Sequence, residues 1–473
     1  MLQIGRTRRQ PQGVSVTGKV FLPAASGSCL GMLHSLGMRA RPATVTSRLQ
    51  RLRQALDAPA VRVAWQALWT SRLVVLISGV LAVLSFGRAT DWRGFDPTRL
   101  TTPFGYFGNL LAAPFARWDS AWYLAIAHGG YGHEPARTAF FPLYPLALRG
   151  LGVVIGSDLV AGVLISLIAF AVSLVLLYRL VALELDDEVA RVAVMLIAFC
   201  PMAYFFSAVY SESLFLALSL GCLWSARNGR WAWAGILGAL AAAERNSGIA
   251  LLVPIVLLFL YGPRADREPV VRPAPASRLR RLLPRYRPAP SLAWALLVPA
   301  GLAAYVVALA LATGDGLAPF HAQQVWFRHF AGPFGGVWDG AVAAWDGLRQ
   351  LLHGPPPPIY FTKSGGDPLV VAGQNLMLFG FLVAGAVALV GAFRRLPFAY
   401  GAYSLVALAM PLSYPASPQP LMSLPRYEVV LFPLFIWSAS WIRRRALTTP
   451  AVAAVAVLLG LFTAEFATWR FVA

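Results

Sequence analysis

Residues 159–181 form a continuous apolar stretch, LVAGVLISLIAFAVSLVLLYRLV, which contains a single charged residue, Arg179. A helix of this length and composition is long enough to span the hydrocarbon core of a bilayer. Ten further apolar stretches occur in the chain: Leu73–Phe86, Ala190–Val209, Leu214–Ala226, Trp231–Ala243, Ile249–Tyr261, Leu292–Thr313, Leu376–Phe393, Phe398–Leu412, Val429–Ile442 and Pro450–Phe466. The sequence therefore predicts an all-α polytopic membrane protein with about eleven transmembrane helices, within a range of roughly nine to thirteen.

The composition excludes the other broad classes of protein. Hydrophobic residues make up 58% of the 473 residues, charged residues make up 13%, and the mean hydropathy is +0.62. A water-soluble protein of this size and composition could not bury all of its apolar residues. A disordered chain has a lower hydrophobicity than this one. The apolar stretches are continuous rather than alternating, which argues against an outer-membrane β-barrel.

The net charge of +20 is interpreted as membrane topology and not as a nucleic-acid-binding surface. Basic residues concentrate in a few loops, as is typical of the cytoplasmic side. With the N-terminus in the cytoplasm, the arginine-rich loop 262–290 is inside, and the two longest other loops, 87–156 and 314–375, are outside. An odd number of spans then leaves the C-terminus outside.

Two parts of the chain are predicted from this topology. Residues 1–71 form a basic cytoplasmic segment, within which Met32 and Met38 offer alternative starts, and residues 72–473 form the transmembrane domain. Arginine greatly outnumbers lysine, which together with abundant alanine and glycine suggests a GC-rich bacterial genome. The expected location is therefore a bacterial plasma membrane.

Two features of the transmembrane domain leave alternatives open. An additional helix over Pro142–Ile155 is predicted to be re-entrant or to lie in the membrane interface. The stretches Trp231–Ala243 and Ile249–Tyr261 are short for spans and flank a polar turn, Glu244–Gly248. This turn lies either at the outer surface or in a cavity, since polar backbone at membrane depth needs protein or water around it.

The most informative polar segment is residues 117–149, RWDSAWYLAIAHGGYGHEPARTAFFPLYPLALR, in the first predicted outer loop. Aromatic residues alternate there with carboxylates, histidines and an arginine. Aromatic faces cover the C–H surface of a sugar, while carboxylates bind or deprotonate its hydroxyl groups. The segment therefore indicates a carbohydrate site better than a simple interfacial belt of aromatic residues.

The motifs WD-x-x-W-Y-L-x-I-A, G-Y-x-x-E and A-F-F-P-x-x-P in this segment resemble the PIG-V family, the GPI mannosyltransferase II type enzymes. Later segments extend the resemblance: YFFSAVYSESLF (204–215), RNSG (245–248), and LPRY (424–427) with LFP (431–433). The resemblance implies a GT-C type glycosyltransferase that moves a mannosyl group, with inversion, from a polyprenyl-phosphate donor. It implies a glycolipid, glycan or protein acceptor on the outer face, and no cofactor.

Candidate residues for this chemistry follow from their types and positions. Asp119 is the predicted base, with a solvated helix cap as the alternative, and Glu134 is second. Arginine suits phosphate because its planar fork forms paired hydrogen bonds, so Arg137, Arg245 and Arg426 are predicted to hold the donor phosphate. The predicted sugar or acceptor contacts are Trp118, Trp122, Tyr123, His128, Tyr131, His133, Tyr144 and Glu212. For Glu212, pairing with an arginine is the alternative.

Other functions remain open at this stage. The two histidines lack a third ligand, so no metal site is predicted, and the metal requirement stays undetermined. The donor could carry a sugar other than mannose. A lipid or solute transporter, and a non-catalytic partner subunit, are the alternatives from other classes.

Overall fold

The structure is a computed structural model that describes residues 58–89, 92–132, 134–270, 283–354, 367–470 and 472. Every regular element in these residues is a helix, and their only β contact is one isolated bridge. The predicted all-α class is thereby confirmed. Most of the basic segment 1–71 and part of the loop 262–290 lie outside the described residues.

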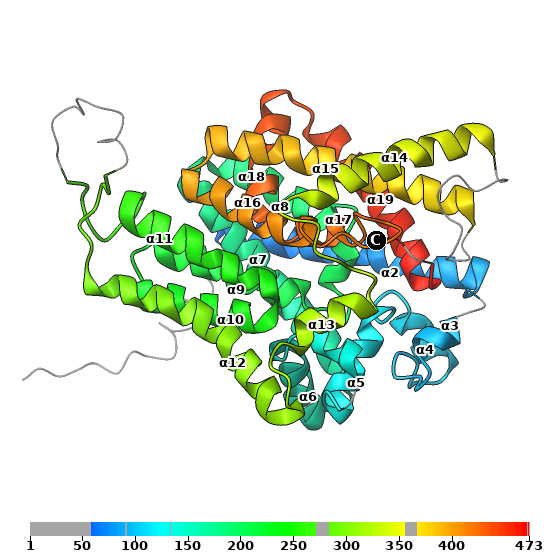
Figure 1. Cartoon of the computed structure of the whole chain (residues 1–473). Helices are drawn as coiled ribbons and strands as arrows, with labels where there is room; N and C mark the ends of the chain where they lie inside the picture. The colour runs from blue at the N-terminus through cyan, green and yellow to red at the C-terminus, as the bar shows by residue number, and fades with distance from the viewer. Residues whose placement is uncertain are drawn as a thin grey trace, which may run out of the picture. The chain divides into compact units, whose positions relative to one another are not determined.

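The helices follow one another along the chain without a sheet between them (Figure 1). Their bounds are α2 (Pro59–Phe86), α3 (Trp92–Phe95), α4 (Tyr106–Ala112), α5 (Asp119–Gly129), η1 (Pro135–Ala139), α6 (Leu143–Ile155), α7 (Asp158–Glu184), α8 (Asp187–Phe199), η2 (Ala203–Phe206), α9 (Glu212–Arg227), α10 (Trp231–Glu244), η3 (Asn246–Leu251), α11 (Leu252–Tyr261), η5 (Pro290–Leu296), α12 (Leu297–Thr313), α13 (Ala318–Val325), α14 (Gly335–His353), α15 (Pro368–Arg395), α16 (Phe398–Leu412), α17 (Leu424–Glu428), α18 (Phe432–Arg444) and α19 (Thr448–Ala467).

Five helical segments of the described residues are long and apolar enough to cross a membrane. They are α2, α7, the continuous segment Pro290–Thr313, α15 and α19. Three other predicted stretches form the shorter apolar helices Trp231–Glu244, Asn246–Tyr261 and Phe398–Leu412, and the predicted additional helix is present as α6. A multi-pass membrane protein follows from these segments, while the count of eleven spans and the side of each loop stay predictions.

The predicted continuous span Ala190–Val209 is wrong in one respect, because α8 ends at Phe199. Pro201 cannot donate the hydrogen bond that a continued helix requires. The chain continues as the short helix η2 and a buried turn that leads to α9. Tyr210 lies in the turn that follows this break, and Glu212 is the first residue of α9.

A buried arginine of α2 satisfies the backbone at this break. Arg72 donates from Nη1 to the carbonyl of Ala203 (2.7 Å) and the hydroxyl of Ser207 (2.9 Å), and from Nη2 to the carbonyl of Ala198 (3.2 Å). A broken helix leaves carbonyl groups without partners, which is costly where water is excluded. Arg72 thus ties α2 to the irregular segment that positions α9.

The helix packing places the two ends of α9 in different surroundings. Helix α9 packs along α7 and α10, α2 packs on α19, and α14 lies along α15 (Figure 1). At the C-terminal end of α9, Arg227 forms an ion pair with Glu184 of α7, and Tyr400 of α16 donates to the same carboxylate (2.9 Å). The N-terminal end of α9 begins with Glu212, roughly 22 Å away along the helix.

We predict that Arg72→Met destabilises the protein because three acceptors at the break lose a charged donor. The expected loss in the free energy of unfolding is about 3 kcal/mol, measured by thermal unfolding in detergent. Arg62→Met, on an exposed position of the same helix, is the matched control and should change stability little. Equal stability of the two variants would contradict this role of Arg72.

Candidate active site

A cavity of about 1890 Å³ lies where α5, η1 and the polar turn after α10 meet residues of α12, α13, α15, α17 and α19. Its wall combines rings such as Trp122 and Tyr305 with carboxylates and arginines, including Asp119 and Arg426. These residues come from segments hundreds of positions apart in the chain. The cavity is therefore a product of the whole transmembrane fold rather than of one loop.

Asp119 is the first residue of α5 and lies on the cavity wall. The preceding residue, Trp118, has a φ of 51° and a ψ of −117°, a conformation that non-glycine residues rarely adopt. The buried Arg117 holds the backbone here, with Nε donating to the carbonyl of Ala467 (3.0 Å). Strain of this kind persists where the surrounding structure fixes a functional geometry.

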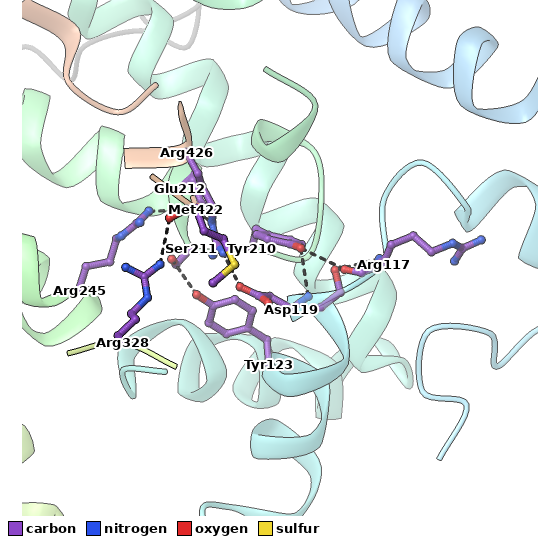
Figure 2. A network of polar contacts seen from close by, with 11 residues as sticks. Arg117, Asp119, Tyr123, Tyr210, Ser211, Glu212, Arg245, Arg328, Met422 and Arg426 are labelled. Atoms are coloured by element: carbon purple, nitrogen blue, oxygen red, sulfur yellow. Dashed lines mark hydrogen bonds and ion pairs between the residues drawn. The ribbon is translucent and has the colours of Figure 1, made fainter. Parts of the chain in front are cut away.

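The hydroxyl of Tyr210 also fixes the start of α5. It accepts a hydrogen bond from the backbone N–H of Asp119 (3.1 Å) and donates to the carbonyl of Arg117 (3.2 Å) (Figure 2). One residue later, Ser211 accepts a hydrogen bond from the hydroxyl of Tyr123 (2.9 Å). The segment before α9 therefore clamps α5 at two points.

Arg426 connects Asp119 to a buried carboxylate. Its Nη1 donates to Oδ2 of Asp119, and its Nε donates to Oε1 of Glu212 (Figure 2). Nη1 of Arg245 donates to the same Oε1 at 2.9 Å. The result is a chain of alternating charges, Asp119–Arg426–Glu212–Arg245, called the charge network below.

The charge network is electrically balanced, with two carboxylates and two guanidinium groups. The Glu212 side chain is 0% exposed, so it needs both cations to offset the loss of hydration. Burial alone would lower the pKa of Arg426, but the carboxylates of Glu212 and Asp119 raise it well above its ordinary value. Arg426 therefore remains charged and holds Asp119 at the cavity surface, where its side chain is 25% exposed.

Three further arginines, Arg137, Arg328 and Arg470, line the cavity outside the charge network. Arg137 donates from Nη1 to the carbonyl of Gly130 (3.0 Å), and its buried Nε has no partner among the described residues. Arg328 donates to the carbonyls of Tyr414 (3.1 Å) and Met422 (3.0 Å) (Figure 2). These guanidinium groups give the cavity positive charge beside Asp119.

The structure brings most of the predicted site residues to the cavity wall. Trp118, Trp122, Tyr123, Asp119, Glu134, Arg137, Arg245 and Arg426 all line it. Trp122 stacks on Phe140, with ring centroids 6.0 Å apart, and meets the edge of Trp326 at 5.6 Å. The aromatic and charged residues of the first predicted outer loop thus face a common space.

Other predicted contacts lie elsewhere. Tyr144 is fully buried between α6 and α7, where its hydroxyl donates to the carbonyl of Gly162 (3.0 Å). Tyr131 donates to the carbonyl of Phe140 (2.9 Å), and His128 is exposed at the end of α5; neither is part of the cavity wall. Glu212 lies behind the wall, in the arginine pairing that was its alternative. His133 lies outside the described residues.

Several residues of the cavity were not predicted. Tyr210 lies in the YSE segment, directly before Ser211 and Glu212, so that motif carried the signal. Trp326 and Arg328 lie beyond α13, in a part of the second predicted outer loop that has no recognisable motif. The structure places both residues on the cavity wall.

The structure also decides between the two alternatives for the polar turn. Helix α10 ends at Glu244, Arg245 is extended, and η3 follows from Asn246. All three residues line the cavity. The polar turn therefore lies in a cavity, while its depth in the membrane stays a prediction. Within the described residues, no three His, Cys, Asp or Glu side chains gather as a metal site would require.

The fold and the cavity define a class of protein: a helical membrane protein with a carboxylate–arginine network beside aromatic rings. Residues 70–260 match the family model described as Mannosyltransferase (PIG-V). This stretch contains α5, the YSE segment and the polar turn after α10. The resemblance to the PIG-V family is thereby confirmed for residues 70–260.

Curated relatives match a similar part of the chain. GPI alpha-1,6-mannosyltransferase 2 of Mus musculus is 34% identical over 172 residues, which cover 33% of this chain and 34% of that protein. GPI mannosyltransferase 2 of Drosophila pseudoobscura pseudoobscura is 30% identical over 187 residues, 34% of this chain and 40% of that protein. The matches thus span only about a third of the length of these relatives.

A solved structure also aligns with the chain. It is the archaeal oligosaccharyltransferase AglB from Archaeoglobus fulgidus, in complex with an inhibitory peptide and a dolichol-phosphate. The alignment covers 85% of this chain and 56% of that one, with 14% identity. Its TM-score of 0.34 is too low to indicate a shared fold.

We predict that Glu212→Gln lowers the free energy of unfolding by about 3–5 kcal/mol, because it leaves two buried guanidinium groups with one carboxylate. Glu188→Gln removes an exposed partner of Arg443 and should cost less than about 1 kcal/mol. Thermal unfolding of both variants in detergent measures the difference. If Glu212→Gln is as stable as the wild type, the charge network does not hold this region together.

Proposed function

We propose that the protein is a mannosyltransferase that takes its mannosyl group from a polyprenyl-phosphate-mannose donor. In this proposal it has a GT-C type architecture and acts, with inversion, on a glycolipid, glycan or protein acceptor. The family match over residues 70–260 supports mannosyl transfer. The observation that carries the proposal is Asp119, a fixed carboxylate on the wall of a cavity lined with rings and arginines.

The proposed reaction uses one carboxylate as a base. The acceptor hydroxyl oxygen forms a bond to the anomeric carbon as the bond from that carbon to the phosphate oxygen breaks. Asp119 takes the hydroxyl proton, and the polyprenyl phosphate leaves with the electron pair of the broken bond. Arg426 binds Oδ2 of Asp119, so the proposed acceptor of the proton is Oδ1. A positioned base of this kind contributes roughly 10²–10⁴ in rate.

The departing phosphate needs positive charge. Arg245 and Arg426 are both engaged by Glu212, so in this proposal they act mainly by positioning. Arg137 has an unpartnered Nε, as far as the described residues go, and lies on the cavity wall. It is the proposed direct contact for the donor phosphate, because a guanidinium can form two parallel hydrogen bonds with phosphate oxygens.

The proposed side of action is the outer face. Arg227, at one end of α9, belongs to the group of arginines expected in the cytoplasm by the positive-inside pattern. Glu212 and the cavity lie at the other end of the same helix. If the Arg227 end is cytoplasmic, the cavity opens toward the opposite leaflet, where a lipid-linked donor could enter from the membrane.

We predict that Asp119→Asn strongly slows transfer while the protein stays folded, because the amide keeps the side-chain shape but cannot take the proton. Purified protein is incubated with radiolabelled polyprenyl-phosphate-mannose and a membrane extract as the acceptor. The variant should lose roughly 10²–10⁴ in rate.

The control for this experiment is Asp187→Asn. Asp187 is the first residue of α8, as Asp119 is of α5, but it does not line the cavity. The control should transfer at the wild-type rate. A folded Asp119→Asn protein with full activity would contradict the assignment of the base. A folded wild type that moves neither mannose nor another polyprenyl-linked sugar would contradict the proposed function.

We predict that Arg137→Gln raises the KM for the donor about tenfold or more, because a charged hydrogen bond to phosphate is lost. Arg149→Gln is the control: Arg149 lies on α6, pairs with Asp158 at 3.5 Å and does not line the cavity. Initial rates over a range of donor concentrations give the KM of each variant. An unchanged KM for Arg137→Gln would contradict the phosphate contact.

A further inference from the structure

Glu244 is a buried carboxylate that the proposed reaction does not use. It is the last residue of α10, it is 2% exposed, and it contributes to the cavity wall. Neither of its carboxylate oxygens has a hydrogen-bond partner among the described residues. Both oxygens of a carboxyl group can take part in hydrogen bonds, so Glu244 has an unused capacity for hydrogen bonds.

The groups around Glu244 do not supply the hydrogen bonds that its side chain lacks. The backbone N–H of Tyr144 and the guanidinium of Arg245 attract the carboxylate, whereas the carboxylate of Glu212 repels it. Arg245, however, already donates to Glu212 at 2.9 Å. Burial raises the pKa of the Glu244 carboxyl well above its ordinary value, and a hydroxyl group of a bound ligand would complete its hydrogen bonding.

Two other acids with little exposed side chain, Glu212 and Glu184, are paired. Glu212 binds two arginines, and Glu184 binds Arg227 and the hydroxyl of Tyr400. These side chains are bonded by the fold itself. Glu244 differs from them because it borders a cavity and has no such bonds within the described part of the chain.

The wall near Glu244 has the character of a sugar site. Asn246, two residues further on, is exposed and lines the cavity, where its amide can donate and accept hydrogen bonds. The rings of Phe141 and Tyr305 pack together on the same wall, with centroids 4.6 Å apart. Tyr131 packs on Tyr305, and its hydroxyl is close enough to the carboxyl group of Glu244 to interact with it electrostatically. Rings and unpaired polar groups together match the C–H faces and hydroxyl groups of a sugar.

We propose that Glu244 is a specificity-determining residue that accepts hydrogen bonds from hydroxyl groups of the sugar in this cavity. The inference rests on the proposed function and extends it, because it assigns to Glu244 the recognition of the sugar and not the transfer itself. The hydroxyl groups belong either to the donor mannose or to a sugar of the acceptor. A site built to bond a hydroxyl rejects a sugar that lacks it, since the buried polar group is then left unpaired.

The test compares wild type, Glu244→Gln and a control, Glu428→Gln. Glu428 is also a buried acid, 8% exposed, but it is not part of the cavity wall. Binding is measured from the fluorescence of the cavity tryptophans with two sets of probes. The donor probes are polyprenyl-phosphate-mannose and its monodeoxy derivatives, and the acceptor-side probes are methyl α-mannoside and its monodeoxy derivatives. Thermal unfolding without ligand is recorded for each protein.

In the wild type and in Glu428→Gln, removal of the hydroxyl that bonds Glu244 should weaken binding about 10- to 100-fold. In Glu244→Gln, the same deoxy probe should bind nearly as well as the parent sugar. The probe set that shows this effect identifies the donor or the acceptor as the source of the hydroxyl. The unliganded Glu244→Gln protein should unfold at the wild-type temperature or above, because the amide replaces a buried carboxyl group that has no hydrogen-bond partner among the described residues.

Two results would overturn the proposal. One is an unfolding temperature of Glu244→Gln below that of the wild type, which would assign Glu244 a structural role. The other is a Glu244→Gln protein that discriminates among the deoxy probes as the wild type does. Both readouts are independent of turnover. A wild type that binds these sugars but transfers no mannose would count against the proposed function and leave the role of Glu244 in sugar binding supported.

Discussion

A carboxylate removed from water must be neutralised by nearby cations or hydrogen-bond donors, and the structure around Glu212 depends on this constraint. Glu212 accepts from Arg245 and from Arg426 at one oxygen. Three segments that are distant in the sequence must therefore come together: the start of α9, the turn after α10, and α17. Their approach brings residues of all three segments, such as Ser211, Arg245 and Arg426, to the cavity wall.

The same pairing determines the position of Asp119. Arg426 donates one hydrogen bond to Glu212 and another to Asp119. The buried pair Arg426–Glu212 therefore holds the side chain of Asp119 in place on the cavity surface. Tyr210 and the strained backbone of Trp118 fix the start of α5 from the other side. Preorganisation of this kind lets a short helix on the cavity wall present a reactive group without a costly rearrangement.

A part of this arrangement could be predicted from the sequence. The apolar stretches locate the helices, because the bilayer demands long apolar segments with satisfied backbone groups. The motif segment around Asp119 identifies residues that do line the cavity, since aromatic residues there interleave with carboxylates, histidines and an arginine. For Glu212, the sequence predicted either a sugar contact or pairing with an arginine, because a carboxylate at the end of a span requires a partner.

The remaining features depend on tertiary contacts. The break after Phe199 is stabilised by Arg72, more than a hundred positions away, so the apolar run Ala190–Val209 suggested a continuous span. Tyr144 resembles a sugar-binding tyrosine within the motif segment, yet helix packing buries its ring against α7. Arg328 has no recognisable motif around it and reaches the site through the fold of the second predicted outer loop. Local patterns cannot specify such contacts, because they arise from the packing of distant helices.

The central claim is that the cavity beside the charge network holds the donor sugar with its reactive carbon near Asp119. The most direct measurement is a cryo-electron microscopy structure of the protein with a non-transferable phosphonate analogue of polyprenyl-phosphate-mannose. The account predicts density for the sugar in the cavity beside Asp119, with the phosphonate at the cavity arginines and the lipid chain leading into the membrane. Density for the analogue at a site remote from Asp119, in a protein whose charge network is intact, would contradict it.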